Sequence, residues 1–283
     1  MLNRSRGGFT LAEVMIALVL TLVVTGTLYG LLISTQRTTR AQAQRVELQS
    51  TLRAGSLIVL NELRELAALP RGSAAQNDIL VAGSTALVYR AMRGLGFVCA
   101  TPDVATIRIA RNTFSGHRDP QAGRDEAFVF VAADEGTGSE DSWNATRISG
   151  VATGAACPGS AGPGITLTVP AGALPAALEV GAPVRITEVM ELRLYESEGR
   201  SWLGARSVAS GEAIQPLVGP LTRESGFRLE YLDAAGSAVA ERSSIKSIRV
   251  ALRGAAVGGG WGNGASVEDE IRAQVTLRNA VRP

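Results

Sequence analysis

The chain has 283 residues with 28 basic and 26 acidic side chains, a formal net charge of +2, and charges of both signs mixed along its length. Hydrophobic residues make up 46% of it, enough for a substantial core, so the composition excludes wholesale disorder. The chain has no block of like charges, so it lacks the electrostatic footprint of a nucleic-acid-binding protein. We predict no nucleic-acid partner.

The first element predicted along the chain is an apolar helix. Residues 14–33 are twenty consecutive residues without a charge. As a helix they would span about 30 Å, the thickness of the hydrocarbon core of a bilayer. Arg4 and Arg6 precede the segment and Arg37 and Arg40 follow it, so the positive-inside rule does not fix its orientation.

Three interpretations of this segment compete. A secretory signal peptide has a shorter apolar region followed closely by a small-residue cleavage site, whereas here the apolar run continues into a helix-favouring segment. A plain single-span anchor fits the length but leaves Glu13 unexplained, because a carboxylate at the entry of an apolar helix costs a few kcal/mol unless something pairs with it.

The third interpretation is a family resemblance. The segment Gly8-Phe9-Thr10-Leu11-Ala12-Glu13, followed by the apolar helix, resembles the processing and methylation motif of type IV pilins and type II secretion pseudopilins. The resemblance implies that residues 1–8 are a cytoplasmic leader, that prepilin peptidase cuts between Gly8 and Phe9, and that the new α-amino group of Phe9 is methylated. It also implies that Glu13 attracts the N-terminal amine of a neighbouring subunit during assembly, which would give the buried charge a partner.

The helix is predicted to continue beyond the membrane. Apolar residues recur at a spacing of mostly three, four and seven, which marks one face of an amphipathic helix, at Leu48, Leu52, Val59, Leu63 and Leu66, with Ile58 and Leu60 beside them. The stop signal Leu69-Pro70-Arg71-Gly72 follows. We expect a helix from Phe9 to Ala68, with residues 9–36 in the membrane or filament core and residues 37–69 against the exported domain.

Residues 70–283 are predicted to form an exported β-rich domain. Short alternating or β-branched runs bounded by turn residues predict strands at Ala86–Met92, Ala105–Arg111, Ala127–Ala132, Ile165–Val169, Val184–Tyr195, Ser201–Ala209, Phe227–Tyr231, Ile245–Leu252 and Ala273–Leu277. The predicted class is α+β, one long helix packed on a largely antiparallel sheet. The pattern of residues 227–237, 244–252 and 275–279 is similar to W-type minor pilins and J-type minor pseudopilins.

The cysteine, histidine and serine residues show no pattern typical of a catalytic site. Cys99 and Cys157 lie outside any CxxC spacing, and without a clustered histidine they do not complete a zinc site. Export would allow them to pair as a disulfide, although the sequence does not show that the two sulfurs meet. His117 is the one histidine, and no nucleophile signature surrounds any serine.

Two segments could be either plain surface loops or ligand-binding loops. An acidic cluster, Asp134, Glu135, Glu140 and Asp141, favours a solvated loop over a calcium site, because its spacing does not match the EF-hand pattern. The glycine-rich segment around Trp261, residues 258–264, lacks the Lys-Ser/Thr ending of a phosphate loop and indicates a flexible hairpin loop.

The sequence therefore predicts a structural, non-catalytic minor pilin or pseudopilin subunit with no cofactor and no metal. It would cross the inner membrane once, with its C-terminal domain periplasmic or extracellular, and later join a pilus or pseudopilus. The expected partners are the prepilin peptidase, other pilin or pseudopilin subunits and the inner-membrane assembly platform. The alternative is a single-span anchored, exported binding protein that forms no filament.

Overall fold

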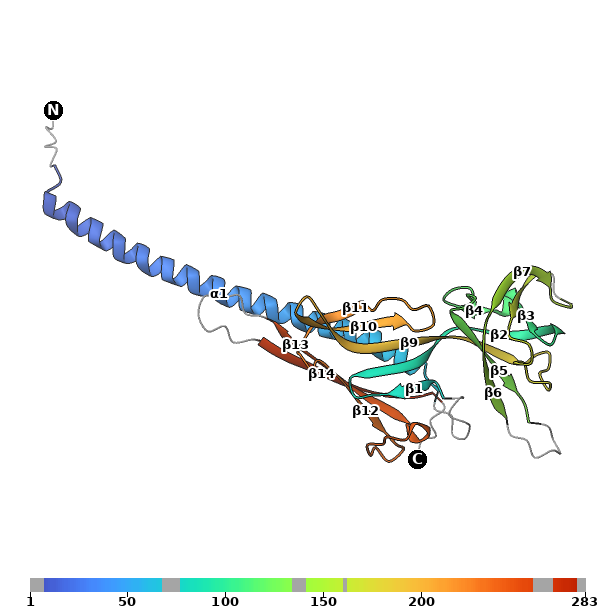
Figure 1. Ribbon diagram of the computed structural model, residues 1–283. Coiled ribbons are helices and arrows are strands. Elements are labelled where there is room, and N and C mark those ends of the chain that lie inside the picture. Colours follow the sequence, from blue (N-terminus) through green and yellow to red (C-terminus); the bar gives the residue numbers. More distant parts are fainter. Residues whose placement is uncertain (1–7, 68–76, 134–140, 160–161, 257–266, 279–283) are drawn as a thin grey trace. The chain divides into compact units, whose positions relative to one another are not determined.

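The computed structural model describes residues 8–67, 77–133, 141–159, 162–256 and 267–278 (Figure 1). By its contacts the chain divides into two units. One comprises residues 1–49 and 256–267, and the other residues 50–255 and 268–283. The first contains the greater part of the N-terminal helix, and the second contains the last turns of that helix together with the sheet.

A single helix, α1, runs from Leu11 to Arg64 over 54 residues, which is about 80 Å at 1.5 Å per residue. The prediction of one long N-terminal helix is confirmed, but the helix ends before the predicted Ala68. It ends there because Ala67 is held in another conformation. Its N–H donates to Oδ2 of Asp78 at 2.8 Å, and it forms a parallel bridge with Arg278.

The predicted α+β class is also confirmed, since the rest of the described chain is a largely antiparallel sheet (Figure 1). The main path of the sheet has the order β12-β13-β11-β10-β9-β2-β3-β8-β7. The strands are β1 (Ile79–Ala82), β2 (Ala86–Asp103), β3 (Thr106–Ala110), β4 (Ser115–Gly116), β5 (Asp125–Val131), β6 (Ser142–Arg147), β7 (Gly150–Ala156), β8 (Pro163–Thr168), β9 (Pro183–Ser197), β10 (Arg200–Ser207), β11 (Gln215–Leu221), β12 (Phe227–Leu232), β13 (Ser247–Ala256) and β14 (Val267–Thr276), with two 3-10 turns at Arg111–Thr113 and Arg242–Ser244.

The two long strands β2 and β9 form the spine of the sheet. They pair from Ala86↔Arg193 to Phe97↔Pro183, with one shift of register between Met92 and Gly94. Along one half of the spine, β10 pairs with β9 over residues 190–197. Along the other half, β5 pairs with β9 over residues 184–188, and β3 pairs with β2 from residue 98 onward. The spine strands are therefore shared by two halves of the sheet.

The last turns of α1 pack on the first half. Leu52, Val59 and Leu63 of α1, and Leu66 just after it, are at most 1% exposed, which confirms the predicted apolar stripe. Ile58 lies outside the stripe, because 45% of it is exposed. The hydroxyl of Tyr89 on β2 donates to Glu62 of α1 at 3.2 Å, which ties the polar margin of the helix to the spine.

The second half has a core of its own. It lies among β2, β3, β5, β8 and β9 and consists of ten buried residues, Val98, Ile107, Ile109, Ala127, Val129, Ile148, Ile165, Leu167, Val184 and Ile186. All ten are aliphatic, as expected from a chain with only six phenylalanines and four tyrosines.

The strands differ from the predicted ones in two ways. Five strands lie outside the predicted set: β1, β4, β6, β7 and β11. Two predicted strands are longer than expected, because Ala86–Met92 continues to Asp103 and Ala273–Leu277 belongs to a strand that begins at Val267.

Candidate functional site

The N-terminus of α1 is capped by reciprocal hydrogen bonds between Thr10 and Glu13. The Glu13 carboxylate accepts the backbone N–H of Thr10 and its hydroxyl, both at 2.9 Å, and the Glu13 N–H donates to Oγ1 of Thr10 at 3.3 Å. This is a capping box, in which a threonine and a glutamate three residues apart satisfy donors that the first helical turn leaves open. The carboxylate of Glu13 is therefore hydrogen-bonded within its own chain.

Gly8 and Phe9, the residues on either side of the predicted cleavage, lie just before this cap. Phe9 is 88% exposed, and a Cβ placed on Gly8 would have nothing within 4 Å. The peptide between them is thus unobstructed on the described part of the chain. Residues 1–7 of the predicted leader lie outside the described residues.

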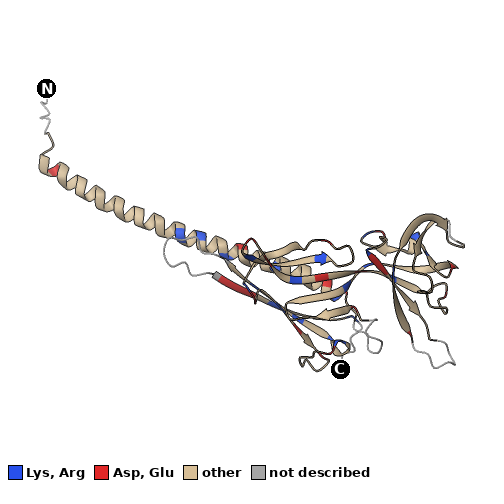
Figure 2. Cartoon of the chain, in the orientation of Figure 1, with Lys and Arg blue, Asp and Glu red and all other residues tan. Residues whose placement is uncertain are grey.

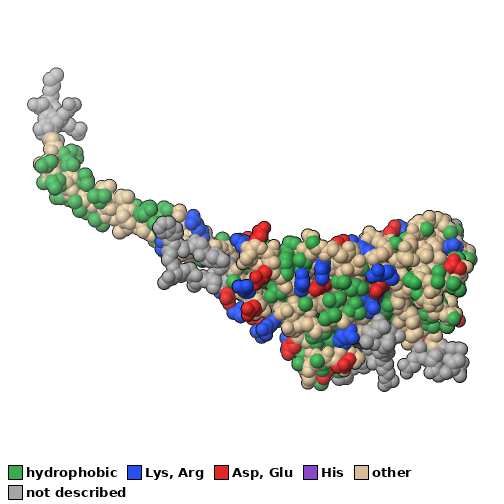
Figure 3. All heavy atoms as spheres, in the orientation of Figure 1, with side chains coloured by type: hydrophobic (Ala, Val, Ile, Leu, Met, Phe, Trp, Pro, Cys, Tyr) green, Lys and Arg blue, Asp and Glu red, His purple; other side chains and the backbone are tan. Residues whose placement is uncertain are grey.

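The helix that follows is apolar and exposed in the single chain, as the green side chains near its start show (Figure 3). It is long and apolar enough to cross a membrane. Its threonine side chains are satisfied internally: the hydroxyls of Thr21, Thr25 and Thr27 donate to backbone carbonyls three or four residues earlier at 2.7–2.8 Å. An apolar surface with its hydroxyls satisfied in this way is suited to lipid or to the packing of other helices.

The N-terminal region, which contains the cap and the apolar helix, matches a known family model. Residues 3–29 match the family model described as the prokaryotic N-terminal methylation motif. The chain carries a prepilin-type methylation motif. The motif supports a type IV pilin-like protein, and the apolar helix is consistent with a single-pass membrane anchor. No curated protein and no solved structure matches the chain.

Sequence reasoning singled out Glu13 of this motif and missed Thr10. The signal that would have found Thr10 is present, because Thr-x-x-Glu directly before an apolar run is the sequence signature of a capping box. The structure adds that the glutamate has a local structural role whatever else it binds.

The two cysteines lie together in the sheet unit. Cys99 of β2 and Cys157, the residue after β7, form a disulfide with their Cα atoms 5.6 Å apart. Strands β3 and β8 separate β2 from β7 in the sheet, so the bond joins strands that are not neighbours.

A buried group of ion pairs links the spine to β5. The Glu188 side chain is 2% exposed and contacts Arg93 at 2.8 Å, Arg118 at 3.2 Å and Arg124. The buried Asp125 accepts two hydrogen bonds of 2.6 Å from Arg118. Burial by itself raises the pKa of Glu188, but the hydrogen bonds from Arg93 and Arg124 outweigh it and lower the pKa to about 2. Carboxylates occupied by guanidinium groups in this way form a structural network.

Other candidates contribute no reactive centre. His117 is exposed, and its backbone N–H donates to the Arg93 carbonyl at 2.9 Å. Among the described residues, no group of three His, Cys, Asp or Glu side chains is placed to hold a metal ion. Of the predicted acidic loop only Asp141 is described, and it accepts the Ala133 N–H at 2.8 Å. Asp134, Glu135, Glu140 and the glycine-rich residues 258–264 lie outside the described residues.

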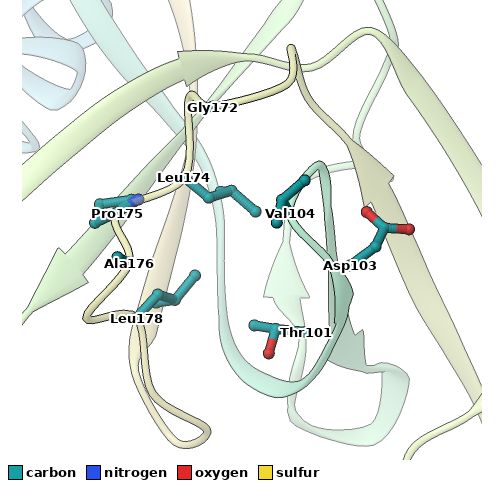
Figure 4. A pocket seen from close by; sticks show the side chains of 8 residues that line it. All are labelled: Thr101, Asp103, Val104, Gly172, Leu174, Pro175, Ala176 and Leu178. Atoms are coloured by element: carbon teal, nitrogen blue, oxygen red, sulfur yellow. The ribbon is translucent and has the colours of Figure 1, made fainter.

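One hollow of about 420 Å³ lies between the turn that joins β2 to β3 and the loop before β9 (Figure 4). Its lining is mostly aliphatic, from Thr101, Asp103, Val104, Gly172, Leu174, Pro175, Ala176 and Leu178. The carboxylate of Asp103, its one ionisable lining group, accepts the Ala105 N–H at 2.8 Å. This lining offers contact surface and no acid, base or nucleophile arranged for catalysis.

Proposed function

We propose that the chain is a structural minor pilin or pseudopilin subunit without catalytic activity. Prepilin peptidase would cut between Gly8 and Phe9, the Phe9 amine would be methylated, and the product would assemble into a type IV pilus or a type II secretion pseudopilus. The observation that carries the proposal is the methylation motif at the start of an exposed apolar helix. Other pilin-like subunits and an inner-membrane assembly platform are the partners that this function requires.

The apolar segment would be buried first in the membrane and later in the filament. In the membrane, residues 14–33 are covered by lipid, and the sheet domain lies on the periplasmic side. In a filament, the helices of neighbouring subunits would cover the same side chains. Burial of apolar surface stabilises by roughly 25 cal/mol per Å² in either setting, so the transfer from bilayer to filament need not expose the helix to water.

Cleavage would create the charge that assembly uses. The bond between Gly8 and Phe9 is a neutral peptide in the precursor, and its hydrolysis leaves a cationic amine on Phe9. In the proposed filament this amine pairs with the Glu13 carboxylate of a neighbouring subunit. A carboxylate in apolar surroundings is tolerated when it is paired and hydrogen-bonded, which supports this role for Glu13.

The deciding experiment is the intact mass, with N-terminal sequencing, of membrane-extracted protein from cells with and without an active prepilin peptidase. We expect a chain beginning at methylated Phe9 in the first cells and at Met1 in the second. A chain that begins at Met1 in both, or that is cut near residue 35, would contradict the proposal and favour a plain membrane anchor or a secreted protein.

A further inference from the structure

Two arginines just beyond the apolar segment are exposed and unpaired. Arg37 and Arg40 belong to α1, and both are exposed. Among the described residues, neither guanidinium has a hydrogen bond or an ion pair. Elsewhere in the chain, by contrast, arginines such as Arg93 and Arg118 are paired with carboxylates.

The sequence of the helix explains why they are unpaired. No aspartate or glutamate occurs between Glu13 and Glu47. A carboxylate three or four residues away on the same helix is the usual local partner of an arginine, and neither Arg37 nor Arg40 has one. Figure 2 shows the helix with red near its start, then an uncharged length, then blue. These two cations therefore have no carboxylate partner among the described residues and are available to an anion from outside the chain.

Their distance from the apolar segment identifies that partner. Arg37 and Arg40 follow Ile33 by four and seven residues, which places their backbones about 6 Å and about 10 Å beyond the hydrocarbon core. The headgroup layer on each side of a bilayer is about 5–7 Å thick. Side chains of an α-helix lean toward its N-terminus, so both guanidiniums point back toward this layer.

We propose that Arg37 and Arg40 bind the phosphates of anionic phospholipids in the periplasmic leaflet and thereby set the depth of the helix in the membrane. The aliphatic stems lie along the helix while the charged ends reach the headgroups. Planar guanidinium groups suit phosphate oxygens because they donate two parallel hydrogen bonds. The proposal rests on the membrane insertion and orientation of the proposed function, and it does not depend on cleavage or filament assembly.

The same helix provides matched controls. Arg45 and Arg53 also belong to α1 and are exposed, but they follow Ile33 by about 18 Å and about 30 Å, beyond the reach of a side chain to the headgroups. The double variants Arg37→Gln/Arg40→Gln and Arg45→Gln/Arg53→Gln change the net charge equally. Glutamine and arginine have similar helix propensities, so both variants should keep α1, which circular dichroism checks.

The test is lipid retention by the full chain, counted by native mass spectrometry after extraction from nanodiscs of phosphatidylglycerol or of phosphatidylcholine. We expect wild type and Arg45→Gln/Arg53→Gln to retain phosphatidylglycerol preferentially. We expect Arg37→Gln/Arg40→Gln to bind it roughly thirtyfold more weakly, since each arginine near a membrane surface contributes about a fivefold attraction.

Three results of the lipid-retention measurement would overturn the proposal. They are unchanged phosphatidylglycerol retention in Arg37→Gln/Arg40→Gln, an equal loss in Arg45→Gln/Arg53→Gln, and equal retention of phosphatidylcholine by wild type. Displacement of the lipid by inorganic phosphate at matched concentration would also overturn it, because the site would then recognise free phosphate. Failure of the proposed subunit function appears separately, as an unprocessed N-terminus in the mass of the same samples.

Discussion

Glu13 is assigned two roles that a single substitution by alanine would remove together. Its carboxylate caps Thr10 within the chain, and its charge is proposed to attract the amine of a neighbouring subunit. Glutamine separates the two roles, because its side-chain oxygen still accepts the Thr10 N–H while the charge is gone.

We therefore predict that Glu13→Gln keeps the first turn of α1, and that Glu13→Ala weakens it because the Thr10 N–H loses its acceptor. Both variants should enter the membrane normally and both should be incorporated into filaments well over tenfold less, since loss of one partner of a buried pair costs about 3–5 kcal/mol. Hydrogen exchange of the amides of residues 10 and 13, which form the cap, and the subunit content of sheared filaments measure the two effects. Normal incorporation of Glu13→Gln would show that only the cap matters.

At the residue scale, Glu188 makes the sheet unit sensitive to acid. The pKa of this carboxyl is about 2 in the folded chain and near 4.5 in an unperturbed glutamate. Because the folded value is the lower one, the unfolded chain takes up the proton first as the pH falls. The stabilisation, roughly 3 kcal/mol, is therefore present above about pH 4.5 and is lost between about pH 4.5 and pH 2.

The corresponding variant is Glu188→Gln, compared with wild type by urea unfolding at pH 7, 4 and 3. We expect it to be less stable at pH 7, since its three arginines lose a buried counter-charge, and we expect the gap to narrow as the pH falls. Glu196→Gln is the control, because the pair of Glu196 with Arg223 is largely exposed and should change stability by less than about 1 kcal/mol. A gap that stays constant with pH would refute the assignment.

At the scale of elements, α1 lies close to the sheet at Gly55. A Cβ at this position would lie 2.3 Å from Cγ2 of Val218 on β11, which is 3% exposed. Alanine is the better helix former by about 1 kcal/mol, yet here the added methyl has no space. The glycine thus sets how closely the helix and the sheet approach.

We expect Gly55→Ala to lower the free energy of unfolding by about 1–3 kcal/mol, as overpacking does elsewhere. Val218→Ala opens the space, so the double variant should be more stable than the sum of the two single effects, as a double-mutant cycle measures. Gly30→Ala, where a Cβ meets nothing within 4 Å, is the control. Additive effects in the cycle would mean that the helix shifts instead of pressing on Val218.

The elements that the sequence predicted are those whose pattern is local. The uncharged run and the apolar stripe predict α1 because helical periodicity is visible within one segment. Strand β2 extends past the predicted end at Met92 and includes Gly94 and Gly96, although glycine usually weakens the interior of a strand. Each leaves room for a distant side chain: a Cβ on Gly94 would lie 2.5 Å from the Phe114 ring, and one on Gly96 would lie 2.4 Å from Ile109.

Other elements and contacts depend on residues far away in the chain. β7, with the sequence Gly-Val-Ala-Thr-Gly-Ala-Ala, has little β propensity and is a strand because it pairs with β8. Likewise, Glu188 meets Arg93 across 95 residues, and no spacing rule predicts such a pair. At the N-terminus, by contrast, Gly8, Phe9 and Glu13 lie within one short segment, so a local pattern singles them out.

At the scale of the whole sheet, the Cys99–Cys157 disulfide joins residues 58 positions apart, and the segment between them includes β3, β5 and β6 and contributes to the second core. In the chain-entropy account, a cross-link over a loop of this length stabilises by roughly 4 kcal/mol. The bond lies in one half of the sheet, but β2 and β9 run through both halves. A shared spine should make the two halves unfold together.

Two tryptophans can test this cooperativity. Trp143 on β6 stacks on Phe128 inside the loop closed by the disulfide, and Trp202 on β10 lies outside it. In full-length variants that keep one of these tryptophans, with the others replaced by phenylalanine, we expect Cys99→Ser/Cys157→Ser to shift the urea midpoint of both probes to the same lower value. Reduction of the parent variants should reproduce the shift. If only Trp143 responds, the two halves unfold independently despite the shared strands, and the disulfide stabilises its own half alone.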